Sequence, residues 1–334
     1  MKHKSEEGMK VGIIIPAYKV KEKILDVITS IGKEVSEICV VDDGCPENSG
    51  RAIQQYINDP RVVVLFHNKN KGVGAAMKTG FNYYLDRDID IIVKMDGDGQ
   101  MKSRDLKSLI FPLVSREADY SKGNRFFSIE SMRRIPKIRL FGNVILSFFS
   151  KAASGYWNIF DPNNGFVAIR KPVLREINFS KVSNRYFFES DMLFRLYLLG
   201  ARVVDVPIVA NYENEKSSLS LWKASVEFPL KHFRNLIKRI FLTYFVKDFS
   251  LPGLQLLFGS LFLFSGSVLG LLSFLRAQEQ ATSTPPGTLI LFALLMFFGF
   301  QLILGFISYD VQNVPKRATS REIEFIQDRP TRDE

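Results

Sequence analysis

Cysteine and histidine are scarce in this sequence of 334 residues, which contains two cysteines and three histidines. Cys39 and Cys45 are too few to hold a fold together with disulfides, and with the scattered His3, His67 and His232 they form no zinc-binding pattern. The sequence shows no partner for these histidines, so catalysis by a histidine base is not expected.

Glycine-rich phosphate-binding motifs are missing as well. The chain has no Walker A sequence, and although Gly72-Val73-Gly74 begins like a dinucleotide-binding motif, Met77 stands where the third glycine is needed. We therefore interpret Gly72 and Gly74 as the start of a helix beneath a nucleotide.

Two long stretches contain no charged residue, Phe249–Leu275 and Thr288–Tyr309. Each exceeds the roughly 20 residues with which a helix crosses about 30 Å of hydrocarbon. The connector between them contains Pro285, Pro286 and Gly287, which favours a tight turn between two antiparallel membrane spans. A buried helical hairpin in a soluble core is the alternative, but neither stretch has the polar face of a soluble helix.

The net charge is +10, and much of the basic excess flanks these two spans. Five basic residues precede the first span and three follow the second: Lys231, Arg234, Lys238, Arg239, Lys247, Lys316, Arg317 and Arg321. Because positive residues stay on the cytoplasmic side, we expect an integral protein of the cytoplasmic (inner) membrane with its large N-terminal domain in the cytoplasm. Met1–Lys10 is polar and charged, so no cleavable signal is expected there. Anionic lipid accounts for the charge, and no nucleic acid is expected as a partner.

The first half of the chain alternates short apolar runs with helical patterns. The runs expected as strands are Val11–Ile15, Ile38–Val41, Val62–Phe66 and Ile89–Met95, and those expected as helices are Lys21–Lys33, Ser49–Ile57 and Gly74–Leu85. This order predicts an α/β fold with a mostly parallel sheet, in which ligands bind beyond the carboxyl ends of the strands. Three polar motifs fall at such ends: Pro16-Ala17-Tyr18, Asp42-Asp43-Gly44 and Asp96-Gly97-Asp98.

Two basic, aromatic segments have apolar residues at helical spacing, Arg133–Ser154 and Ser220–Val246. Helices of this kind suit a bilayer interface. For the first segment an ordinary core helix stays an equal alternative, whereas the second leads directly into a membrane span and favours the interface. We therefore divide the chain into a catalytic domain (1–217), interfacial helices (218–248), two membrane helices (249–310) and a tail (311–334), which we expect to be loosely ordered.

The clearest chemical signal is the acidic pair Asp96 and Asp98. Residues two apart in an extended chain point the same way, so both carboxylates can face one site. Carboxylate oxygens suit Mg²⁺ or Mn²⁺, which would neutralise charge on a departing diphosphate. An acidic turn without a metal is the alternative for this pair taken alone.

Taken in order, four motifs resemble the signature of family 2 glycosyltransferases with a GT-A fold. They are Ile13-Ile14-Ile15-Pro16-Ala17-Tyr18, Val40-Val41-Asp42-Asp43-Gly44, Asn70-Lys71-Gly72 and Asp96-Gly97-Asp98-Gly99-Gln100. The resemblance implies that a nucleotide-sugar donor binds to Pro16, Tyr18, Asp42, Asp43, Lys71, Gly72, Asp96, Gln100 and Arg125. It also implies that Asp98, with Asp96, binds the metal ion.

The second half resembles the polyprenyl-phosphate glycosyltransferases within this family. Gln100, the segment Asp161-Pro162-Asn163-Asn164-Gly165-Phe166 and the two C-terminal spans carry this likeness, and the Gln-x-x-Arg-Trp motif of processive synthases is absent. The resemblance implies inverting transfer of one sugar, of the UDP-glucose or GDP-mannose type, to undecaprenyl or dolichyl phosphate. The sequence leaves open whether the chain forms a homo-oligomer.

The acceptor side is assigned to acidic and basic residues of the second half. Asp161, Glu189 and Asp191 are candidates to orient or deprotonate the acceptor, although each could instead be a structural carboxylate. Arg133, Arg134, Lys137 and Arg139 could bind the lipid phosphate, since arginine contacts phosphate with two prongs, or could form a solvated charged surface. Lys216-Ser217-Ser218 is considered as a lid over the donor.

Two other functions stay open from the sequence. The enzyme could act on another lipid or on a membrane glycan, in which case transfer would not depend on an acceptor phosphate. Alternatively, the chain could be a catalytically inactive membrane scaffold. The paired carboxylates argue against the scaffold, because a binding protein has no need of them in this context.

Overall fold

The computed structural model describes residues 8–127, 137–162, 164–208 and 221–327, which form two compact units. The first unit contains the chain up to Leu236 together with the segment from Pro315 onward. The second unit is Ile237–Val314. The chain thus leaves the first unit and returns to it.

A seven-stranded sheet in the order β3-β2-β1-β4-β6-β5-β7 organises the first unit. Its strands are β1 (Val11–Ala17), β2 (Glu37–Asp42), β3 (Val62–Phe66), β4 (Ile91–Lys94), β5 (Tyr120–Asn124), β6 (Val167–Arg170) and β7 (Val203–Pro207). Only β6 runs antiparallel to its neighbours β4 and β5, and all other pairs of adjacent strands are parallel. This confirms the mostly parallel α/β fold that the sequence predicts.

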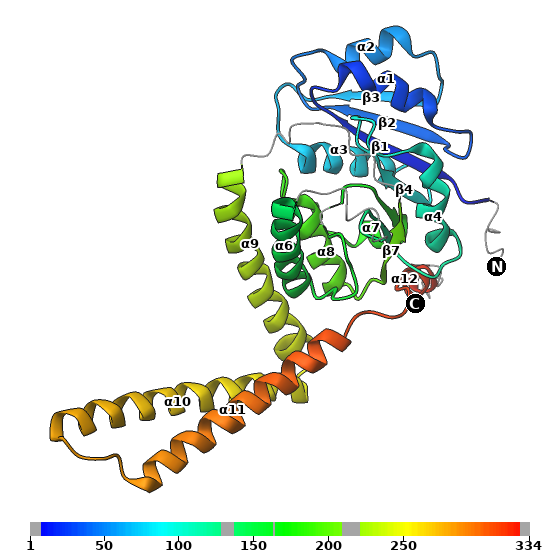
Figure 1. The fold of residues 1–334 in the computed structure, drawn as a ribbon. Coiled ribbons are helices and arrows are strands. Elements are labelled where there is room, and N and C mark those ends of the chain that lie inside the picture. The colour runs from blue at the N-terminus through cyan, green and yellow to red at the C-terminus, as the bar shows by residue number, and fades with distance from the viewer. Residues whose placement is uncertain (1–7, 128–136, 163, 209–220, 328–334) are drawn as a thin grey trace. The chain divides into compact units, whose positions relative to one another are not determined.

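Helices cover both faces of the sheet, which explains why its central strands are apolar on both sides. Side chains from α1 (Lys21–Ser30), α2 (Ser49–Tyr56) and α4 (Leu106–Val114) share one apolar core with alternate residues of β1, β2 and β4. On the opposite face α3 (Val73–Leu85) approaches β1 closely, since a Cβ on Gly80 would lie 2.6 Å from Ile14. The unit is therefore a helix–sheet–helix sandwich (Figure 1).

Further helices lie in the described residues. In the first unit these are the 3-10 turns η2 (Ser103–Asp105) and η3 (Phe179–Lys181) and the helices α6 (Lys137–Ser154), α7 (Lys171–Arg175), α8 (Phe188–Leu198) and α12 (Ser320–Gln327). The helix α9 (Leu221–Phe241) and the π-helical segment η4 (Leu242–Lys247) lead into α10 (Leu251–Gln280) and α11 (Pro286–Gln312).

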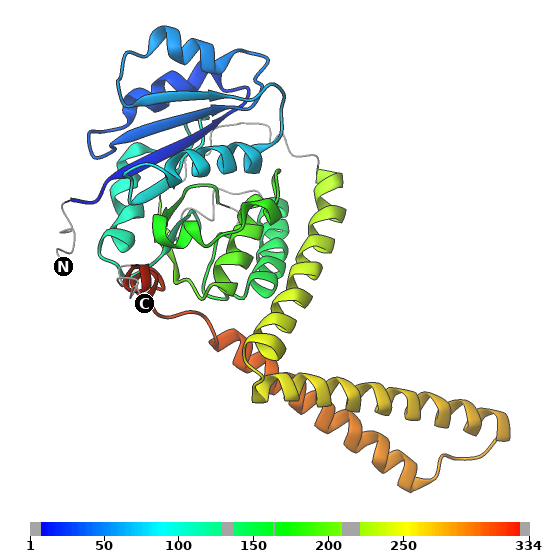
Figure 2. The same cartoon turned by 180° about the vertical axis from the view of Figure 1, so that it is seen from behind.

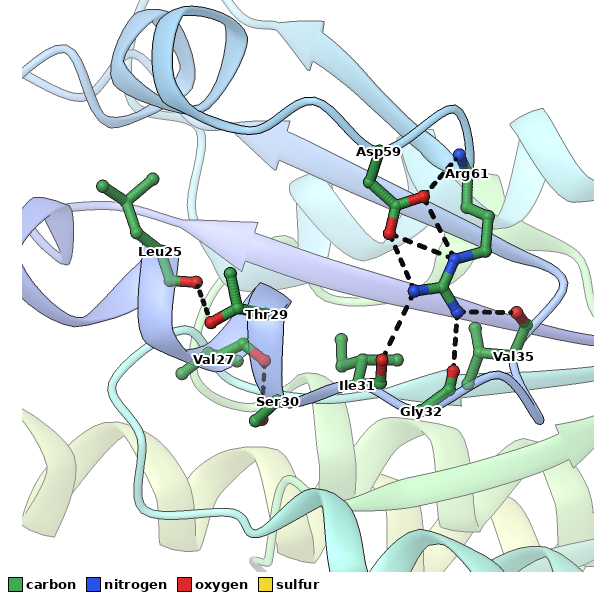
Figure 3. Close-up of polar contacts among 9 residues, drawn as sticks. All are labelled: Leu25, Val27, Thr29, Ser30, Ile31, Gly32, Val35, Asp59 and Arg61. Carbon is green, nitrogen blue, oxygen red and sulfur yellow. Dashed lines mark hydrogen bonds and ion pairs between the residues drawn. The ribbon is translucent and has the colours of Figure 1, made fainter.

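At the amino ends of the strands, Arg61 joins its own loop before β3 to the loop between α1 and β2 (Figure 3). Its guanidinium donates to the carbonyl oxygens of Gly32 and Val35 at 2.6 and 3.1 Å, beyond the end of α1, and to Asp59 at 2.7 Å. The hydrogen bonds from Arg61 to the Asp59 carboxylate lower the pKa of that carboxyl below its ordinary value. The network stabilises the edge of the sheet that lies away from the predicted site.

The C-terminal segment is ordered and docked, so the expectation of a loosely ordered tail is wrong for residues 319–327. Asp119, which is fully buried, accepts hydrogen bonds from the backbone N–H groups of Thr319 at 2.7 Å and Ser320 at 2.8 Å. Glu324 on α12 pairs with Arg170 at 2.6 Å, and with Arg116 at 3.3 Å. These polar contacts, between residues far apart in the sequence, build the segment into the first unit.

The second unit is a hairpin in which α10 and α11 run antiparallel (Figures 1 and 2). Both helices are long and apolar enough to span a membrane, and most of their side chains face outward. The backbones meet where Gly259 faces Gly299, since a Cβ on Gly299 would lie 2.9 Å from the amide nitrogen of Leu263. Such close approach of small residues is typical of helix packing in membranes.

A buried ion pair closes the base of this hairpin. Arg239 contacts Asp310 through two hydrogen bonds of 2.6 and 2.9 Å, and the Tyr244 hydroxyl donates to Asp310 at 2.7 Å. All three side chains are almost fully buried. Removing one partner would leave an uncompensated buried charge, so the three residues hold α9, η4 and α11 together.

Candidate active site

Polar residues gather at the carboxyl ends of the parallel strands. The register places Ala17 beside Asp42, and Lys94 lies between Ile14 of β1 and Val167 of β6. Because β6 is antiparallel, the segment before it, which contains Asp161, reaches the same edge as the ends of β1, β2, β4 and β5. One edge of the sheet thus collects residues from both halves of the sequence.

Asp43 is held in a fixed orientation by three donors. Its carboxylate lies 2.6 Å from Nδ1 of His67 and accepts the backbone N–H groups of Lys71 at 2.9 Å and Gly72 at 2.7 Å. Nε2 of His67 lies 2.9 Å from the Thr79 hydroxyl. Sequence reasoning missed His67; its position directly after β3, next to the end of β2, is the signal that could have found it.

Asp42 points into the protein and has a different part from its neighbour. Its two carboxylate oxygens accept the backbone N–H groups of Cys45 and Gly50, both at 2.7 Å, and the residue is buried. Both oxygens therefore order the loop before α2 and its first turn, which favours a structural role over the donor contact that the family resemblance implies.

The other residues expected at the nucleotide line this edge with unequal exposure. Tyr18 is exposed, with the Lys19 ammonium 5.7 Å from its ring centre, and Pro16 is half-buried in β1. The Lys71 side chain is exposed. Gly72 has φ of +99°, and a Cβ there would lie 2.5 Å from the carbonyl oxygen of Asn184, so the turn that opens α3 requires glycine.

The acidic pair follows β4 as predicted, with both carboxylates half-buried. Oδ1 of Asp98 accepts the backbone N–H of Gln100 at 3.0 Å, and Oδ1 of Asp96 lies 2.9 Å from the Lys94 ammonium. Among the described residues no group of three or more His, Cys, Asp or Glu side chains is arranged to hold a metal ion. Two carboxylates nonetheless fit Mg²⁺ or Mn²⁺ that a diphosphate helps to bind, because these ions keep waters and take phosphate oxygens as ligands.

Lys94 joins the acidic pair to Glu189. Its ammonium also lies 3.2 Å from Oε1 of Glu189 on α8, and its side chain is only 2% exposed. Burial opposes the charged ammonium, but the two carboxylates outweigh it and raise the pKa of Lys94 above its ordinary value. Sequence reasoning missed Lys94, because a lysine at the end of a strand carries no motif of its own.

A second buried lysine lies on β5. The Lys122 ammonium donates to the carbonyl oxygen of Asn164, and burial lowers its pKa to about 8 although Glu189 and Asp161 act in the opposite direction. Two buried lysines therefore lie beneath this end of the sheet: Lys94 contacts carboxylates, and Lys122 contacts a backbone carbonyl oxygen.

Asp161 binds Arg125 with two prongs. Nε and Nη2 of Arg125 donate to the two carboxylate oxygens at 2.7 and 3.1 Å. Asp161 is buried whereas the Arg125 side chain is 29% exposed. The geometry lets Asp161 fix the plane of a guanidinium that reaches the surface of the site.

Glu189 and Asp191 point in different directions and make separate contacts. Residues two apart on a helix point about 200° apart, so only one of them can face the acidic pair. Asp191 instead accepts the backbone N–H of Ser183 at 2.9 Å and contacts Arg195 and Asn235 at 3.4 Å. These contacts favour a structural role for Asp191 and leave Glu189 as the acidic residue beside Asp96.

Several predicted acceptor residues cannot be placed. Arg133, Arg134 and the segment Lys216-Ser217-Ser218 lie outside the described residues. Lys137 and Arg139 lie on α6, whose backbone is described there without their side chains.

The predicted interfacial helices do expose apolar side chains. On α6 the exposed ones are Val144, Ile145, Phe148 and Phe149, and on α9 they are Leu230, Phe233, Ile237 and Phe241. The α9 set recurs at intervals of three and four residues, which is one helix face.

Comparison with known proteins gives a consistent result. Residues 12–178 match the family described as "Glycosyl transferase family 2". The chain is 33% identical to undecaprenyl-phosphate mannosyltransferase of Micrococcus luteus, over 60% of this chain and 83% of that protein. It is 27% identical to UDP-N-acetylglucosamine–dolichyl-phosphate N-acetylglucosaminyltransferase of Methanococcus voltae, over 60% and 85%.

The fold has relatives among solved structures. Glucosyl-3-phosphoglycerate synthase from Mycobacterium tuberculosis, in complex with Mn²⁺, uridine diphosphate and phosphoglyceric acid, superimposes with a TM-score of 0.52. The match covers 70% of this chain and 79% of that one at 17% identity, which shows the likeness of fold alone.

Proposed function

Because the chain belongs to glycosyltransferase family 2 and has a GT-A fold, we propose that it transfers a single sugar from a nucleotide-sugar to a polyprenyl phosphate at a membrane. The observation that carries this proposal is the shared acceptor of its relatives. One relative named above transfers mannose and the other N-acetylglucosamine, yet the names of both specify a polyprenyl phosphate acceptor.

The donor is proposed to bind along the carboxyl ends of β1, β2 and β4. Asp43, which His67 and two backbone amides hold in place, is suited to orient a nucleoside. Asp96 and Asp98 would hold Mg²⁺ or Mn²⁺, and such an ion would supply charge neutralisation for the leaving diphosphate. The solved structure with Mn²⁺ and uridine diphosphate supports a divalent ion in this fold. Arg125, with its plane fixed by Asp161, adds a positive charge on the same side.

The acceptor is proposed to approach from the side of Glu189. A phosphate oxygen is already an anion, so displacement at the sugar needs no strong base, and the sugar carbon is inverted when the attack and the departure are in line. Glu189 then serves to orient the acceptor rather than to remove a proton. Its place beside Asp96 through Lys94 puts it close to the donor carboxylates.

A membrane location fits both a lipid acceptor and the apolar side chains that the helices expose. The hairpin of α10 and α11 is proposed to span the bilayer, and the exposed faces of α6 and α9 to lie at its interface. The catalytic unit is proposed to lie in the cytoplasm, and the basic residues that flank the hairpin support this orientation.

The test is transfer by the purified full chain in lipid nanodiscs. A panel of UDP- and GDP-sugars would be offered with Mn²⁺ and either a short polyprenyl phosphate or the corresponding polyprenol. We expect a glycosylated lipid with one of the donors and only with the phosphate. Asp98→Ala is expected to lower the rate at least about a hundredfold while the melting temperature is kept.

Three results would contradict the proposal. Equal transfer to the polyprenol would point to another lipid acceptor. Near-normal turnover by Asp98→Ala would remove the metal assignment. No transfer or donor hydrolysis with any donor at high enzyme concentration would favour a scaffold.

A further inference from the structure

Lys94 lies where the two sides of the proposed site meet. Lysine is rarely buried unless it is paired, yet this side chain is 2% exposed at the end of a central strand. Its ammonium lies 2.9 Å from Asp96 and 3.2 Å from Glu189. One cation therefore contacts two carboxylates, Asp96 and Glu189, that lie 93 positions apart along the chain.

The backbone at Gly165 lies close against one side of this ion pair. A Cβ on Gly165 would lie 2.3 Å from Nζ of Lys94 and 2.8 Å from Oδ2 of Asp96. The backbone at Gly165 thus closes over the ion pair, and any other side chain there would displace it. This explains why a glycine stands directly before Phe166 in a segment that otherwise packs tightly.

The charges form a unit whose parts depend on one another. Separating a buried ion pair leaves an uncompensated charge, so loss of Lys94 would release both Asp96 and Glu189. The ammonium also occupies an oxygen of Asp96, which is one of the two proposed metal ligands. A divalent cation that arrives alone has to compete with this internal cation for Asp96.

We propose that Lys94 is a positioning residue that fixes Glu189 to Asp96 and weakens cation binding until a diphosphate supplies further negative charge. This inference rests on the proposed function, both for the donor and acceptor sides and for the metal ion at Asp96, but binding of the ion can be measured without sugar transfer. Lys94 thereby makes metal binding depend on nucleotide binding. It also keeps the Glu189 carboxylate at a fixed position relative to Asp96 on the donor side.

The first test measures binding of Mn²⁺ alone, without donor or acceptor, to the full chain in nanodiscs. Electron paramagnetic resonance of free Mn²⁺ gives the dissociation constant. We expect Lys94→Met, which has similar volume and no charge, to tighten Mn²⁺ binding about tenfold or more. Adding Asp98→Ala is expected to abolish the gain, which shows that the ion binds at this site.

Lys122→Met is the matched control. It also removes a buried strand lysine, but that ammonium contacts a carbonyl oxygen rather than a carboxylate of the acidic pair. Its Mn²⁺ affinity is expected to rise clearly less than that of Lys94→Met, because its contact with the Asn164 carbonyl oxygen does not occupy an oxygen of Asp96. Equal affinity of Lys94→Met and the native chain, or equal gains in both lysine variants, would overturn the proposal. If Lys94→Met does not fold, Lys94→Gln gives the same comparison with a neutral polar side chain.

The second test is a double-mutant cycle on the transfer rate. Lys94→Met and Glu189→Gln are each expected to lower kcat, with little change in KM for the donor. The combined variant is expected to be no slower than the slower single variant, because both changes break one bridge. Rates that multiply independently would show that Lys94 does not act through Glu189. A native chain without transfer activity would contradict the proposed function, while the Mn²⁺ measurement would still decide the competition at Asp96.

Discussion

Replacing Asp119 with asparagine tests how firmly the C-terminal segment is built into the catalytic unit. The fully buried carboxylate accepts three backbone N–H groups: those of Thr319 at 2.7 Å, Ser320 at 2.8 Å and Arg202 at 2.9 Å. Asparagine keeps one oxygen and turns an NH₂ group toward at least one of these donors. The change keeps the size of the side chain, so packing is nearly unaffected.

The expected loss follows from the number of hydrogen bonds broken. A hydrogen bond to a charged group contributes about 1.5–3 kcal/mol, and Asp119→Asn weakens all three and breaks one or two. Local opening of residues 319–327 should therefore become easier by about 2–5 kcal/mol. Since each 1.4 kcal/mol is tenfold, amide hydrogen exchange in this segment should accelerate about 30-fold or more.

Hydrogen exchange followed by mass spectrometry on the chain in nanodiscs measures this directly. Arg116→Ala is the control, because it removes the 3.3 Å ion pair between the partly exposed side chains of Arg116 and Glu324 and leaves the Asp119 carboxylate in place. That pair should contribute less than about 1 kcal/mol, which is under tenfold in exchange rate. Unchanged exchange in Asp119→Asn, or an equal effect in both variants, would refute the docking argument.

Three further outcomes are expected. Arg125→Lys loses the two-pronged contact with Asp161, so kcat/KM for the donor should fall at least about tenfold; an unchanged value would separate Arg125 from the donor. Burial lowers the pKa of His232 to about 4, below its unfolded value, so stability is full above about pH 6.5 and declines as the pH falls toward 4. His232→Leu should flatten this acid limb in melting curves, and identical slopes would contradict it. Gly299→Val places a Cβ 2.9 Å from the backbone nitrogen of Leu263, which is too close, so hairpin stability in detergent should fall by about 1–3 kcal/mol. A native melting temperature would argue against the close contact.

Elements with a strong local signal were predictable from the sequence. The strand Val62–Phe66 has the bounds predicted, since it lies between turn residues and consists only of apolar side chains. Both apolar stretches of the second unit became helices within a few residues of the expected ends. The parallel pairing of β1 with β2 and β4 is the arrangement that alternating strands and helices favour.

Contacts between distant residues could not be predicted in the same way. Thr319 meets a carboxylate 200 positions away, and a charged tail gives no sign of such a partner. Likewise, Glu189 and Asp191 read as one acidic motif, and only the helix that contains them separates their directions. His67 and Lys94 carry no motif, so their contacts with Asp43 and Asp96 emerge only when neighbouring strands are placed side by side.

The return of the chain to the first unit has a consequence for biosynthesis. Asp119 and Arg170 are made long before Ser320 and Glu324, and the whole apolar hairpin is translated in between. Until the hairpin has been translated, the Asp119 carboxylate lacks the N–H groups of Thr319 and Ser320, and the Arg170 guanidinium lacks the carboxylate of Glu324. The first unit is therefore completed only after the hairpin has been translated, so a chain that stops before the hairpin lacks the segment that supplies these contacts.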